Sequence, residues 1–84
     1  MPYITQEQRN KWDTWLYSAP LFNLPGELSY VLTRITRSYL LGEKRSYIAY
    51  AMITGVLFLT LMEFVRRMVN PYEDQKIKDN GDVY

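Results

Sequence analysis

Arginine and tyrosine are the side chains of this sequence that could do chemistry, because histidine and cysteine are both absent. Without those two residue types the chain cannot build a Ser/His/Asp or Cys/His catalytic centre, an imidazole or thiolate metal site, or a disulfide. The acids near the C-terminus lie in a short polar stretch, and their spacing does not match a calcium loop. We therefore expect a protein without catalytic activity, metal or cofactor.

Two groups of arginines and tyrosines predict a site for an anionic ligand. Guanidinium groups bind phosphate through paired hydrogen bonds, and tyrosine rings stack on bases. In the segment that follows Glu27, one phenol and two guanidiniums share a helical face. The candidate ligand-binding residues are Tyr30, Arg34, Arg37, Arg66, Arg67 and Tyr72. The alternative interpretation is a solvated helix face that binds nothing.

Glu63 precedes Arg66 and Arg67 by three and four residues. Neighbours at this spacing on a helix form ion pairs that contribute about 0.2–0.5 kcal/mol to an isolated helix. We expect Glu63 to form a structural ion pair with these arginines. A second interpretation is that Glu63 orients them to receive an anion.

Capping and helix-breaking residues predict an all-α fold of about four helices. Thr5 and Gln8 fit a capping box, Ser46 suits an N-cap, and Asn70-Pro71 resembles the end of one helix and the start of another. Gly42 is expected to end the second helix, and Gly81 the fourth. These signals place helices at about 6–19, 27–41, 47–69 and 71–80.

The third predicted helix is the long, central and apolar one. Tyr47 to Met62 is a run of 16 residues without a charge. At 1.5 Å per residue this run is about 24 Å long. Its 16 residues are fewer than the roughly 20 that a membrane span needs. We expect it to form the buried centre of a homo-oligomer, since a helix that is apolar on all sides needs such cover. A single membrane span is the alternative.

Length and composition predict one helical domain over residues 1–84, with a helical body at 1–69 and a short helix and acidic tail at 70–84. The 84 residues are 48% hydrophobic and include eight Tyr, three Phe and two Trp, which is more apolar surface than so small a domain buries by itself. The expected partner is therefore a second copy of the chain. A net charge of +1 does not favour duplex nucleic acid.

Parts of the sequence resemble a family of small proteins from tailed bacteriophages and prophages, to which no activity is assigned. The resemblance lies in the pattern EFxRRxxxPYEDxKIxxNGDVY at 63–84, the opening MPYI, and PGELSYV at 25–31. In that family the middle of the third helix is usually more polar than residues 55–61 here. The resemblance implies a protein that binds host factors or sequesters host signals.

We therefore expect a homo-oligomer, located in the cytoplasm of a bacterial host, that binds and sequesters a phosphorylated small molecule such as a nucleotide defence signal. The polar N-terminal stretch does not resemble a secretion signal, and the absence of cysteine agrees with an intracellular site. One alternative is a protein-interaction module that acts on a host or phage protein. A second is a small single-span membrane protein.

Overall fold

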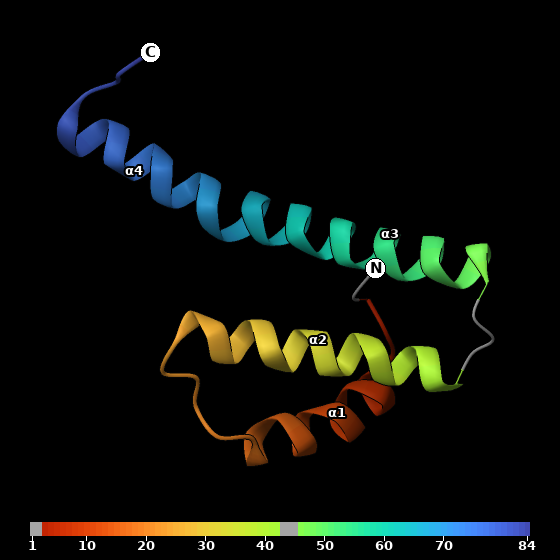
Figure 1. Ribbon diagram of the computed structural model, residues 1–84. Helices are drawn as coiled ribbons and strands as arrows, with labels where there is room; N and C mark the ends of the chain where they lie inside the picture. The colour runs from red at the N-terminus through yellow and green to blue at the C-terminus, as the bar shows by residue number, and fades with distance from the viewer. Residues whose placement is uncertain (1–2, 43–45) are drawn as a thin grey trace. The chain divides into compact units, whose positions relative to one another are not determined.

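The computed structural model of the protein describes residues 3–42 and 46–84, and all regular structure in these ranges is helical (Figure 1). The predicted all-α class is confirmed. The chain forms two compact units, Pro2–Ile53 and Thr54–Tyr84, which are described separately below. The predicted polar turn at 43–45 and the first two residues of the MPYI motif lie outside the described residues.

Helix α1, Gln6–Ser18, begins with the predicted capping box. The Thr5 hydroxyl oxygen accepts the backbone N–H of Gln8 at 3.2 Å, and the Gln8 side-chain oxygen accepts the backbone N–H of Thr5 at 3.0 Å. Two donors that a helix start leaves without partners are thereby satisfied. The helix ends at Ser18, before Pro20, as the sequence predicts.

Helix α2, Pro25–Gly42, begins two residues before the predicted start and ends at the predicted glycine. Proline suits the first helical position because its missing N–H would have no partner there. The Glu27 side chain reaches back over the loop, and its Oε1 accepts the backbone N–H groups of Asn23 at 2.8 Å and Leu24 at 2.9 Å. One carboxylate therefore joins the loop to the first turn of α2.

The prediction of a separate fourth helix is wrong. Helix α3, Tyr47–Phe64, begins as expected, with the Ser46 hydroxyl accepting the Ala49 N–H at 3.2 Å. It then passes through a π-helical turn, η1 at Val65–Val69, into α4, Asn70–Asn80, so that one helix of 34 residues runs from Tyr47 to Asn80. Asn70, the predicted N-cap, has helical backbone angles, φ −62° and ψ −47°.

The π turn explains how the helix continues past Pro71. A proline inside an α-helix lacks the N–H for its hydrogen bond, and its ring clashes with the carbonyl four residues earlier. Here the N–H of Asn70 donates to the carbonyl of Val65, five residues back, so the turn before the proline holds one extra residue. The helix ends instead at Gly81, as predicted, where φ is +89°.

Among the residues that the structure describes, neither unit has a hydrophobic core of its own. Ala49, 7% exposed, is the sole buried residue in the described part of the chain. On α3, Leu57 is 45% exposed and Phe58 59% exposed, so the predicted burial of this helix is not found within one chain. The apolar stripe of α2 is also about half exposed at Leu28, Leu32 and Ile35. Both helices therefore carry exposed apolar surface.

Replacing Pro71 with alanine tests the account of the π turn. Pro71→Ala restores an N–H that can donate to the carbonyl four residues back, and proline is about 3 kcal/mol less favourable than alanine inside a helix. We expect unchanged helix content and a higher melting temperature by circular dichroism. Pro25→Ala is the matched control, since proline at a first helical position has no such cost. Loss of helix in Pro71→Ala would instead indicate that Pro71 starts a separate helix.

Candidate functional site

The loop that joins α1 to α2 forms an open groove with the helix ends on either side of it. Pro20 follows the end of α1 and Pro25 begins α2, so the residues between the two prolines cannot join either helix. The groove has a volume of about 890 Å³ and a mainly apolar lining. Grooves of this size and character, with a few polar groups, are typical of small-molecule sites.

Three aromatic side chains line the groove, one from each segment that forms it. They are Trp15 of α1, Phe22 of the loop and Tyr30 of α2. Trp15 packs against Trp12 one turn earlier, with ring centroids 6.4 Å apart and ring planes at 86°, an edge-to-face contact that helps to hold its orientation. Phe22 and Trp15 are about half exposed, so their rings remain accessible to a ligand.

Tyr30 and Arg34 are the predicted site residues that the structure brings together at this groove. The Arg34 guanidinium donates to the Tyr30 hydroxyl oxygen at 2.9 Å, and its central carbon lies 5.7 Å from the centre of the Tyr30 ring. Tyr30 lines the groove and Arg34 does not, so the guanidinium lies next to a lining residue. Arg37, on the same face of α2, forms no hydrogen bond or ion pair with another described residue.

Glu27 is the charged residue among those that line the groove. Its Oε1 caps the loop, as described above, whereas Oε2 accepts no hydrogen bond from the described residues. The carboxylate lies at the start of α2, where the partial positive charge of the helix dipole favours an anion. It therefore has a structural role in the loop and is also one of the residues that line the groove.

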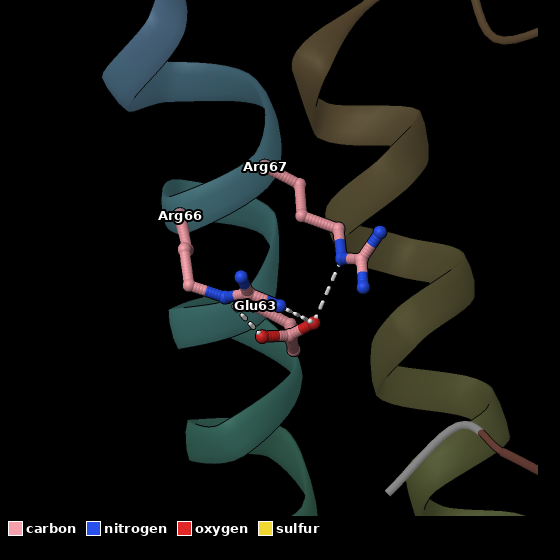
Figure 2. A network of polar contacts seen from close by, with 3 residues as sticks. All are labelled: Glu63, Arg66 and Arg67. Atoms are coloured by element: carbon pink, nitrogen blue, oxygen red, sulfur yellow. Dashed lines mark hydrogen bonds and ion pairs between the residues drawn. The ribbon is translucent and has the colours of Figure 1, made fainter.

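A second polar cluster lies at the end of α3 and consists of Glu63, Arg66 and Arg67 (Figure 2). Arg66 donates twice to the Glu63 carboxylate, at 2.7 and 3.0 Å, and Arg67 donates once at 3.0 Å. The arginine side chains are 62% and 60% exposed, and that of Glu63 is 31% exposed. The cluster keeps a net positive charge and holds both guanidiniums in place.

The two predicted groups of ligand-binding residues belong to different units. Tyr30, Arg34 and Arg37 belong to the unit Pro2–Ile53, whereas Arg66, Arg67 and Tyr72 belong to the unit Thr54–Tyr84. Within the second unit Tyr72 contacts Lys76, whose ammonium lies 5.4 Å from the ring centre. Within the described ranges, no group of three or more acidic side chains is arranged to hold a metal ion.

Reasoning from the sequence missed Trp15, Phe22 and Glu27 as site residues. It treated the stretch between the two prolines as a connection and Glu27 as a helix-dipole residue. The available signal was the spacing of Pro20 and Pro25, which encloses large apolar side chains in a segment too short to bury them. Apolar residues held in a loop between two helix ends predict either a contact with another protein or a ligand-binding groove.

Neutralising Glu63 tests how much the arginine cluster contributes to stability. Exposed ion pairs contribute about 0–1 kcal/mol and are screened by salt. We expect Glu63→Gln to lower the free energy of unfolding by less than about 1 kcal/mol, with a difference that shrinks at high salt. Denaturant titration at two salt concentrations measures this, with Glu73→Gln as the matched control. A larger loss of unfolding free energy that salt does not reduce would contradict the interpretation of Glu63 as a member of an exposed ion pair.

Comparisons with known proteins place the chain in a family without assigning it an activity. The model of a domain of unknown function, DUF6899, matches residues 1–83, nearly the whole chain. No curated protein and no solved structure matches it. The chain described above therefore belongs to the DUF6899 family.

Proposed function

We propose that this protein binds a phosphorylated, nucleotide-like small molecule in the groove between α1 and α2, and that it does so as a homo-oligomer. The supporting observation is the Tyr30–Arg34 contact at the edge of an aromatic groove within one unit. Aromatic rings offer stacking surfaces for a planar base, and a guanidinium offers paired donors to a phosphate. The groove and its edge thus suit the two ends of a nucleotide.

The groove favours binding without turnover. Its one carboxylate, Glu27, is engaged through Oε1 by two backbone N–H groups, and the Ser18 hydroxyl in the lining donates to the Trp15 carbonyl at 2.7 Å, so the two are not hydrogen-bonded as nucleophile and base. A hydrolytic or transfer reaction would need such a pair, or a metal-activated water. A ligand that is held and released unchanged agrees with a sequestering role, which would withdraw a nucleotide signal from solution.

Helix α2 offers separate faces for the ligand and for self-association. At 100° per residue, Glu27, Tyr30 and Arg34 fall on one side of the helix. Leu28 and Ile35, from the half-exposed apolar stripe, fall on another side. Leu28 and Ile35 are not among the groove-lining residues, so packing through them leaves Glu27 and Tyr30 outside the contact.

Helix α3 gives a stronger reason for self-association. Its large side chains are exposed around the whole helix, and contiguous apolar surface of this kind marks a contact with a protein or a membrane. Packing of α3 between copies covers this surface in water. Polar groups at Tyr50, Thr54 and Thr60 favour a protein environment over a hydrocarbon one.

A second candidate is a small single-span membrane protein. The helix Tyr47–Asn80 is long and apolar enough, by length and composition, to cross a membrane, and little of its apolar part is buried. Arg66 and Arg67 would then lie at one membrane surface. The uncharged run of about 24 Å is shorter than a hydrocarbon layer of about 30 Å, a mismatch that costs only fractions of a kcal/mol per ångström.

Removing the guanidinium at the groove edge tests the proposed ligand site. We expect Arg34→Ala to weaken the binding of a nucleoside monophosphate by about 10- to 100-fold, because charge-assisted hydrogen bonds to the phosphate are lost. Isothermal titration calorimetry measures the change. Arg9→Ala is the matched control. Arg9 lies on α1, donates a hydrogen bond to the carbonyl of Ile4, and is not among the groove-lining residues. Mass spectrometry of the recovered nucleotide checks that it is unchanged.

Failure of the wild-type protein to bind any nucleotide or phosphate would contradict the proposed function. It would favour the alternative of a protein-interaction module.

Native mass spectrometry of protein from a detergent-free extract tests self-association. We expect a defined oligomer in the wild type and a shift toward monomer in Phe58→Lys, because a charge on α3 cannot be buried between copies without a partner. Tyr17→Lys, at an 86% exposed position on α1, serves as control and keeps the oligomer. Protein found only in the membrane fraction would contradict the oligomer and support the second candidate.

A further inference from the structure

We propose that the groove prefers guanine over the other bases, and that the Glu27 carboxylate makes this choice. The inference rests on the proposed nucleotide binding and specifies its ligand. It comes from the one charged side chain in a mainly apolar lining. A carboxylate beside stacking rings recognises N–H donors on the edge of a planar ligand.

The Glu27 carboxylate is held in position before any ligand arrives. Its Oε1 accepts the N–H groups of Asn23 and Leu24 at 2.8 and 2.9 Å, and the Glu27 N–H itself donates to the Leu24 carbonyl at 3.0 Å. Three hydrogen bonds therefore tie residue 27 to the loop. Such pre-organisation reduces the entropy that binding loses, and it fixes the direction in which Oε2 can accept.

An ionised carboxylate accepts hydrogen bonds and donates none, which distinguishes the bases. Guanine presents two adjacent donors on its pairing edge, the ring N1–H and the N2 amino group. Adenine and cytosine each place an unprotonated ring nitrogen beside the amino group, and uracil flanks its single N–H with two carbonyls. Those lone pairs repel a carboxylate. Guanine is the base that offers Glu27 two adjacent donors, and its O6 acceptor lies on the side of N1–H away from the amino group.

The spacing along α2 suits a nucleotide whose base lies at Glu27 and whose phosphate lies at Arg34. Seven residues separate them, which is two helical turns and about 10 Å of rise, so both lie on the same side of the helix. This separation is comparable with the length of a nucleoside monophosphate. Tyr30 lies between the two positions, lines the groove with its ring and bonds Arg34 through its hydroxyl.

Calorimetric titration of the full-length protein with GMP, IMP and AMP tests this inference. IMP keeps the N1–H of guanine and lacks the N2 amino group, whereas AMP lacks both adjacent donors. We expect GMP to bind about 10-fold more tightly than IMP, and IMP about 10-fold more tightly than AMP, since one charge-assisted hydrogen bond is lost at each step.

Glu27→Gln tests the role of the carboxylate. The amide oxygen of glutamine can still accept the N–H groups of Asn23 and Leu24, while its NH₂ group replaces the acceptor that guanine needs. We expect the ratio of GMP to AMP affinity to fall to about one, with AMP binding retained. Glu7→Gln, which makes the same charge change on α1, leaves the ratio unchanged.

The outcomes separate the two proposals. Equal affinity of the wild type for GMP and AMP overturns the guanine preference and leaves nucleotide binding in place. Binding of neither nucleotide overturns the proposed function itself. A selective wild type together with a Glu27→Gln variant that keeps the same selectivity assigns the choice of base to another group and overturns the role of Glu27.

Discussion

The absence of a polar face on α3 is the constraint on which the rest of the structure depends. A helix in water is stable when its apolar side packs on something and its polar side faces solvent. Helix α3 has apolar side chains all round, and among the described residues only Ala49 is buried. Whatever covers α3 also decides where the chain works, because other copies of the chain would keep it in solution and lipid would keep it in a membrane.

Helix α2 differs from α3 in that its side chains divide by direction. One side carries the groove residues Tyr30 and Arg34, and another carries the apolar stripe that includes Leu28 and Ile35. A helix of this kind can join an assembly through one side and leave the other accessible. The short proline-bounded loop before α2 also stays accessible, since Glu27 holds the loop by hydrogen bonds and not by burial.

Local signals were enough to predict most helix ends. The Thr5 and Gln8 capping box, the Ser46 cap and the Gly81 stop are short-range interactions whose partners lie within four residues, so the sequence contains both sides of each contact. The helix break at Asn70-Pro71 was predicted wrongly, because a π turn upstream relieves the proline without ending the helix. The groove was missed since its lining residues come from three segments and meet only after the chain turns.

The π turn also gives the two ends of the long helix a fixed rotational offset. One additional residue in a turn rotates everything after it by about 100° around the helix axis relative to an uninterrupted α-helix. The side chains of α4 are therefore turned by this angle from the directions that an uninterrupted α-helix would give them. Because the offset is fixed, whatever surrounds the apolar segment also sets the direction in which the charged side chains of α4 face.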